Sequence, residues 1–86
     1  MARRQVSEED RDVGRRLGAA LREARDAAGI SAQTIASASE LSIDTVRSIE
    51  TGRTAAPSFI TVARIADALG MSLDQLREAV RSGSSS

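Results

Sequence analysis

The stretch SAQTIASASELSIDTVRSIETG (31–52) decides the fold of this chain, because it carries two sets of helix start signals close together. Ser31 and Ser42 are helix-capping residues, and each is followed by a short segment with apolar residues at helical spacing. We expect the second of these helices to span residues 43–51. Residues 39–41 lie between the two segments and predict a tight turn. The stretch therefore predicts two short helices that meet at this turn and cross steeply.

The pattern of apolar residues gives this pair of helices a buried side and an exposed side. Ala36 stands where the helices approach each other, which requires a small residue, and Gly52 ends the second helix. The residues expected to hold the pair against a core are Ile35, Leu41, Val46 and Ile49. The face left for solvent or a partner consists of Ile43, Asp44, Arg47, Ser48 and Thr51. Such a pair is a helix-turn-helix, and its exposed helix fits the major groove of B-DNA.

A longer helix is predicted before this stretch, over residues 13–28. Its apolar positions recur at helical spacing and are Val13, Leu17, Leu21 and Ala24. Ser7, which three acidic residues follow, is a further start signal, so the helix is suspected to begin as early as residue 8. Gly14 and Gly18 weaken such a helix by roughly 1 kcal/mol each relative to alanine.

Two more helices are predicted after the stretch. Pro57 suits the first position of a helix that Gly70 ends. The apolar stripe of that helix is Phe59, Val62, Ile65, Ala66 and Leu69. Ser72 and Gln75 have the spacing of a capping box before a fifth helix, whose apolar face is Leu73, Leu76 and Val80. No strand pattern or repeat competes, so the sequence predicts an all-α fold of five short helices.

The length of 86 residues is sufficient for one domain with one modest core. We expect a polar N-terminal arm or helix extension over residues 1–12, the helix-turn-helix domain over 13–80, and a disordered tail or linker stub over 81–86. Arg3 and Arg4 in the arm either grip DNA or are terminal arginines in solvent.

The composition excludes several classes of function. The chain has no cysteine and no histidine, which removes disulfides, thiol metal sites and the commonest general base. Because the carboxylates show no pairing at catalytic spacing, we expect no enzymatic activity and no cofactor. Phe59 is the single aromatic residue, so binding by base stacking is not expected. Short apolar runs and the lack of a signal peptide predict a cytoplasmic protein without membrane association, bound to the nucleoid when it binds DNA.

The charge balance bears directly on DNA binding. Twelve basic residues, all arginine, balance twelve acidic ones, whereas a DNA-binding protein normally has a basic excess. Binding to DNA therefore requires the arginines to gather on one face. Arginine suits that purpose, since its planar guanidinium makes bidentate contacts with phosphate.

Three segments resemble the Cro/repressor-type (XRE) helix-turn-helix family of bacterial and phage transcriptional regulators. They are LREARDAAGIS (21–31), TIASASELSIDTVRSIETG (34–52) and PSFITVARIADALGMSLDQL (57–76). The resemblance implies a five-helix, lambda-repressor-like DNA-binding domain that acts on transcription, more often as a repressor than as an activator. It also implies a homodimer on a near-palindromic operator of double-stranded DNA, with recognition helices about 34 Å apart.

The resemblance assigns roles to particular positions of this sequence. Arg25 and Glu50 are similar to the family's structural ion pair. The positions that face base edges in the family are Ile43, Asp44, Arg47 and Ser48, and we add Thr45 to the DNA-binding set. The positions at or beside phosphates and flanking bases are Gln33, Thr51, Arg53 and Thr54.

Three features depart from the family's pattern. Ala32 stands where the family often has glutamine, with Gln33 one residue later. Glu40 replaces the usual glycine of the turn, where positive φ strains other residues. Asp44 and Glu40 also bring negative charge toward the DNA-facing side. Asp44 either accepts from the amino group of cytosine or only favours the first turn of its helix.

An alternative function keeps the fold and changes the partner. The neutral charge, the two acids and the apolar side chains Ile43 and Ile60 favour a protein-interaction module, such as an antitoxin or a regulator subunit. The stripe of Leu73, Leu76 and Val80 either packs in the core, or its outer residues form a dimer interface together with Ile60. A positive rim formed by Arg47, Arg53 and the arginines of the first predicted helix favours DNA, whereas a mixed or apolar face favours a protein partner.

Overall fold

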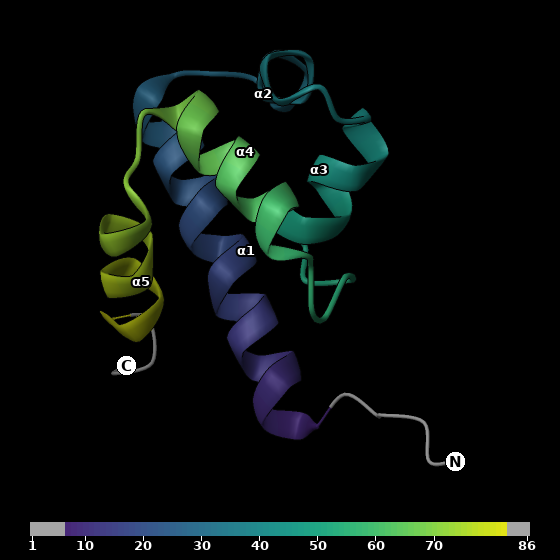
Figure 1. Ribbon diagram of the computed structural model, residues 1–86, viewed down its shortest axis with the longest axis vertical. Helices are drawn as coiled ribbons and strands as arrows, with labels where there is room; N and C mark the ends of the chain where they lie inside the picture. Colours follow the sequence, from purple (N-terminus) through teal and green to yellow (C-terminus); the bar gives the residue numbers. More distant parts are fainter. Residues whose placement is uncertain (1–6, 83–86) are drawn as a thin grey trace.

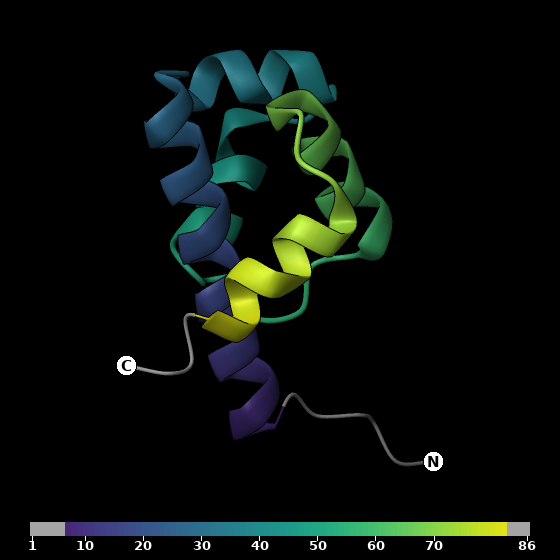
Figure 2. The same cartoon turned by 90° about the vertical axis from the view of Figure 1, so that its left-hand side faces the viewer.

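The long helix α1 (Glu8–Ala28) is the element on which the rest of the domain is assembled. The computed structural model describes residues 7–82, and within them all regular structure is helical. The other helices are α2 (Ala32–Ser39), α3 (Ile43–Glu50), α4 (Phe59–Leu69) and α5 (Leu73–Ser82). Helix α1 packs against α3, α4 and α5, and α2 bridges α3 and α4 (Figure 1). Figure 2 shows α5 crossing from α4 to α1 on the side of the molecule away from α3. The predicted all-α, five-helix fold is confirmed.

Serine caps set where these helices begin. The hydroxyl oxygens of Ser7, Ser31, Ser42, Ser58 and Ser72 each accept the backbone N–H three residues later, at 3.0–3.1 Å. The predicted capping box is present, because the Ser72 N–H also donates to the Gln75 Oε1 at 2.8 Å. Each cap satisfies a backbone donor that the helix itself leaves without a partner, and stabilises the helix by about 1 kcal/mol.

One helix ends on a residue that the turn strains. Gly29 and Gly70 close α1 and α4 in the left-handed conformation that glycine tolerates, with φ of 70°. Helix α2 ends in the same way on Glu40, whose φ is 60°, the one positive φ of a non-glycine residue in the described range. A side chain in this conformation costs roughly 1–2 kcal/mol. The predicted strain at this turn is therefore present.

Several predicted ends of helices are wrong by small amounts. Helix α3 ends at Glu50, and Thr51 is its C-cap rather than its last residue. Pro57 was expected at the first position of α4. Instead, Ser58 is the N-cap of α4, so Pro57 lies just before the cap. Arg81 and Ser82, expected in the tail, are the last residues of α5. Residues 1–6 and 83–86, including Arg3 and Arg4 of the expected arm, lie outside the described range.

The core is built from small and aliphatic side chains contributed by all five helices. Leu21, Val46 and Ile65 are 0–1% exposed, and the other buried members are Ala20, Ile35, Ala36, Ile49, Val62, Ala66 and Leu76. Phe59, expected in the apolar stripe, is instead 69% exposed, because it opens α4 at the margin of the bundle. Two other expected stripe residues, Val13 and Leu73, are also exposed.

Gly14 and Gly18 allow α1 to approach the rest of the domain closely. A Cβ at Gly18 would overlap the carbonyl oxygen of Ile49, at the end of α3. A Cβ at Gly14 would overlap the carbonyl oxygen of Ala55, in the loop before α4. The two glycines lower the helix propensity of α1. This cost is offset by the close packing of α1 against the end of α3 and the loop before α4.

None of the described helices combines the length and the apolar character that crossing a membrane requires.

Candidate nucleic-acid interface

Helices α2 and α3 form the predicted helix-turn-helix. The turn is closed by backbone hydrogen bonds from Leu41 N to Ala36 O at 2.9 Å and from Glu40 N to Ser37 O at 3.2 Å. Ala36 is 1% exposed at the approach of the helices, as its small size predicted. In Figure 1, α2 is seen end-on while α3 is seen from the side, so the two helices cross steeply. Helix α3 consequently lies at the edge of the bundle with one face uncovered.

The uncovered face of α3 is polar. Val46 and Ile49 point into the core, and Ile43 is half-buried against it. Exposed on the opposite side are Asp44, Arg47 and the C-cap residue Thr51, with Ser48 and Thr45 half-buried beside them. The Thr45 hydroxyl is engaged with the Ser42 hydroxyl at 2.8 Å, at the start of the helix.

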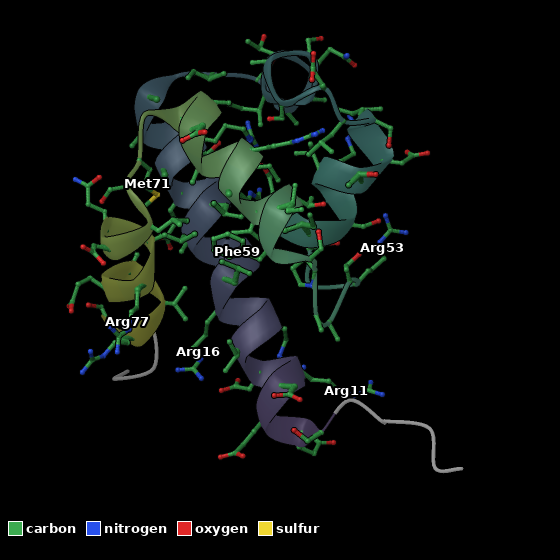
Figure 3. All side chains as sticks on the ribbon, in the orientation of Figure 1. Arg11, Arg16, Arg53, Phe59, Met71 and Arg77 are labelled. Carbon is green, nitrogen blue, oxygen red and sulfur yellow. The ribbon has the colours of Figure 1, made fainter. Side chains whose placement is uncertain are left out.

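The loop after α3 is fastened to that helix by its own side chains. The Thr51 hydroxyl donates to the Arg47 carbonyl at 2.8 Å, and Thr54 N donates to the Ser48 carbonyl at 3.1 Å. The guanidinium of Arg53 donates to the Ser48 hydroxyl at 3.0 Å. Arg53 is therefore held beside α3 while its side chain remains exposed, and Figure 3 shows it on the same side of the molecule as α3.

Arg25 and Glu50 join α1 to the end of α3. The Nε and Nη2 of Arg25 donate to the two carboxylate oxygens of Glu50 at 2.8 and 3.0 Å, and Nη1 donates to the Ile30 carbonyl at 2.8 Å. The two side chains are 15% and 7% exposed. The hydrogen bond to Glu50 raises the pKa of Arg25 above its ordinary value, although burial opposes this shift. Both charges are thus paired at the junction of the two helices.

A hollow of about 460 Å³ opens beside this ion pair, between α1, the start of α2, and α3 with its loop. The residues that line it are Arg22, Arg25, Ala32, Arg47, Glu50, Thr51 and Arg53. Four arginines and one carboxylate therefore line the hollow, and that carboxylate is engaged by Arg25. Asp26, outside the lining, approaches Arg22 at 3.9 Å and Arg25 at 3.6 Å. Although the chain is neutral, a third of its arginines line this hollow beside α3.

The structure brings some of the predicted site residues together and separates others. Arg47, Thr51 and Arg53 meet in the hollow with the pair Arg25 and Glu50. Gln33 is exposed at the start of α2, next to the lining residue Ala32. The predicted residues that do not line the hollow are Ile43, Asp44, Thr45, Ser48 and Thr54.

Arg22 is a lining residue that the predicted DNA-binding set did not name, although the sequence pointed to the arginines of the first helix in general. It lies on α1, outside the helix-turn-helix, and reaches the hollow because it stands three residues before Arg25 on the same face of the helix. That spacing was the available signal. Among the described residues, no group of three or more carboxylates forms a candidate metal site.

A helix-turn-helix with an arginine-lined hollow beside its exposed helix is the architecture of a DNA-binding transcriptional regulator. The family model described as "Helix-turn-helix domain" matches residues 16–79, which is most of the chain, and the chain belongs to this family. Its class as a helix-turn-helix regulator, predicted from the sequence, is therefore confirmed.

A solved structure with the same fold supports this placement. The crystal structure of the clp gene regulator ClgR from C. glutamicum has a TM-score of 0.78 and 31% sequence identity to this chain. The similarity covers 86% of this chain and 94% of that chain. No curated protein sequence matches the chain.

Proposed function

We propose that the chain is a sequence-specific transcriptional repressor that inserts α3 into the major groove of duplex DNA. The observation that carries the proposal is the gathering of Arg22, Arg47 and Arg53 beside the uncovered face of α3. A positive rim at this position is the arrangement that favours DNA over a protein partner, and it compensates for the neutral charge of the whole chain.

Arg47 is the residue on which we expect binding to depend most. It is exposed at the middle of the uncovered face, and its guanidinium can reach either a guanine edge or a phosphate. Ser48 is small enough to permit close approach to bases. Its hydroxyl accepts from Arg53, whose guanidinium we expect to contact the DNA backbone. The remaining proposed contacts are Gln33, Ile43, Asp44, Thr45, Thr51 and Thr54.

Binding is proposed to require a homodimer, so that two copies of α3 enter successive major grooves about 34 Å apart. Ile60 supports this part of the proposal, because it is 65% exposed on the face of α4 that points away from the core. Phe59 beside it is 69% exposed. Neighbouring apolar side chains of this size favour burial against a second copy.

The proposal also extends to where the protein acts and what it does not do. We expect it to work in the cytoplasm on nucleoid DNA, as a binding protein without catalysis or cofactor. The likeness to a protein described as a clp gene regulator supports a role in transcription.

A protein-interaction module is the second candidate function. The exposed pair Phe59 and Ile60, together with the exposed acids Glu40 and Asp44, favours it. In this case the apolar surface of α4 would bind a different protein, and DNA affinity would be weak.

In vitro selection from a random duplex library, at moderate salt, separates the two candidates. We expect enrichment of a near-palindromic sequence, whose affinity falls steeply with salt. Arg47→Ala should weaken binding to the selected duplex by about 10-fold or more, since a contact from a charged donor is lost. Absence of any enriched sequence would rule out the repressor and favour the interaction module.

A further inference from the structure

The first turns of α1 carry an apolar surface that the domain leaves partly uncovered. Residues 8–15 precede the family domain, which begins at residue 16, and Figures 1 and 2 show that this end of α1 extends beyond the other helices. Val13 is 44% exposed there, and Leu17, four residues later, is half-buried. Apolar side chains along a projecting helix end form a face that a partner can cover.

A groove of about 250 Å³ lies beside Val13, between α1 and the loop before α4. The residues that line it are Asp10, Val13, Gly14 and Leu17 on α1 and residues 55–57 of the loop. The loop wall ends at Pro57, and Phe59 and Ile60 follow at the start of α4, where they are 69% and 65% exposed. The groove therefore adjoins the apolar pair that we propose for the dimer.

Charged residues flank Val13 on both sides along the helix. Glu9 stands four residues before Val13 and Arg16 three residues after it, so the three side chains lie on one line along α1. Among the described residues, Glu9 forms no ion pair. Arg16 contacts Asp12 at 3.1 Å through Nη2, but its Nε is buried without an acceptor. Figure 3 shows Arg16 projecting from α1 on the side where α5 lies.

This line of residues is complementary to itself when it is turned end for end. A two-fold axis through its middle makes two copies of α1 run antiparallel, with Val13 of each copy near the axis. Glu9 of each copy then stands opposite Arg16 of the other. A parallel arrangement would instead place like charges against each other, which repel. The order of acid, apolar residue and base therefore favours a second, antiparallel copy as the occupant.

We infer that the first turns of α1 are part of the dimer interface. Each copy covers the groove and Val13 of the other, and Glu9 pairs with Arg16 across the axis. The inference rests on the proposed function, because it states where the proposed homodimer closes. It extends the interface from the start of α4 to a segment of α1 that precedes the family domain.

Cross-linking tests the contact directly. The chain contains no cysteine, so a single introduced thiol reports on one position. Val13→Cys should be joined into a covalent dimer by a short bismaleimide, because the two-fold axis brings the two thiols together. Ala27→Cys is the matched control, since it is also exposed on α1 but lies about four turns further along the helix. Equal cross-linking of the two variants, under conditions where the parent is a dimer, would show that the inference is wrong.

Charge reversal tests the antiparallel order. Glu9→Arg and Arg16→Glu each turn two attractive pairs of the dimer into repulsive ones, so each should raise the dimer dissociation constant by about 10-fold or more. An equal mixture of the two variants should recover the parent's constant, because both positions are then basic in one copy and acidic in the other. Sedimentation equilibrium measures these constants, and circular dichroism checks the helix content of each variant.

The outcomes separate this inference from the proposed function. A dimer that Ile60→Ser dissociates but that both charge reversals leave intact would overturn the inference alone, as would a mixture that stays monomeric. A parent that sediments as a monomer would overturn the inference together with the proposed dimer. If Arg16→Glu loses helix content, Glu9→Arg and the cross-linking of Val13→Cys decide the question, since both positions are exposed.

Discussion

Single residues affect the stability of this protein in two ways, through charge pairing and through backbone conformation. Arg25 and Glu50 are both largely buried, and their three hydrogen bonds tie α1 to the end of α3 and to residue 30. Glu40 holds a left-handed conformation that its side chain disfavours. Both features were visible in the sequence as family positions, but their energetic weight depends on burial and φ, which the structure supplies.

Arg25→Ala and Glu50→Ala are each expected to destabilise the domain by about 3 kcal/mol, because each leaves a partly buried charge without its partner. Urea denaturation followed by circular dichroism measures the loss. A double variant, Arg25→Met with Glu50→Leu, should recover much of it, since neither charge then remains. If both single variants unfold like the parent, the pair has no structural role.

Glu40→Gly is expected to stabilise the domain by about 1 kcal/mol, because glycine adopts positive φ without strain. Thermal unfolding measures the change as a higher Tm. Glu40→Gln is the control, since it removes the same negative charge but keeps the side chain that causes the strain. Equal gains from both substitutions would show that charge, not backbone conformation, limits stability at this turn.

At the scale of elements, the contact of α1 with α3 positions the recognition helix. Gly18 makes that contact possible, since its Cα faces the carbonyl of Ile49 with no room for a methyl group. The hydrogen-bonded loop of Thr51, Arg53 and Thr54 then continues the surface that α3 begins. The position of α3, and with it the proposed DNA contact, therefore depends on how closely the backbones of α1 and α3 pack.

Gly18→Ala is expected to destabilise the domain by about 2 kcal/mol, although alanine is the better helix former, because its methyl group forces α1 and α3 apart. Chemical denaturation measures this loss, and amide chemical shifts should change along α3. Ala19→Gly, at the next and exposed position of α1, should cost about 1 kcal/mol through propensity alone and leave the shifts of α3 unchanged. A stabilising Gly18→Ala would contradict the packing argument.

At the scale of the whole molecule, the distribution of charge and apolar surface matters more than the totals. The chain is neutral, yet four arginines from α1, α3 and the following loop line one hollow beside α3. The exposed apolar residues Phe59 and Ile60 lie next to each other at the start of α4. Two surfaces of different character therefore serve the two proposed partners, DNA and a second copy of the chain.

Ile60→Ser tests the proposed dimer at this scale. Because the side chain is 65% exposed, we expect the Tm to stay near that of the parent, while sedimentation shifts toward the monomer. Affinity for the palindromic duplex should fall by about 10-fold or more as the two half-sites cease to be bound together. Ala38→Ser, at an exposed position of α2, should change neither property. A monomeric parent would contradict the dimer and with it the assignment of this surface.

The sequence by itself determined the elements and the class of protein. Serine caps, left-handed terminators and helical periodicity are local signals, because each acts within one or two turns of the chain. They predicted five helices and the helix-turn-helix of residues 31–52, while the family was predicted from the resemblance of three segments to known regulators; these predictions are confirmed. The misplaced ends at Thr51 and Pro57 reflect the same locality, since neighbouring residues compete for the same cap position.

Only the tertiary structure decided which residues meet. Arg22 and Arg53 are far apart in the sequence and line one hollow because α1 packs against α3 through Gly18. The exposure of Phe59 likewise depends on where α4 begins relative to the bundle, which no periodicity encodes. Contacts between distant segments are set by the packing of whole helices, so the arginine-lined side of α3 appears only when the chain is folded.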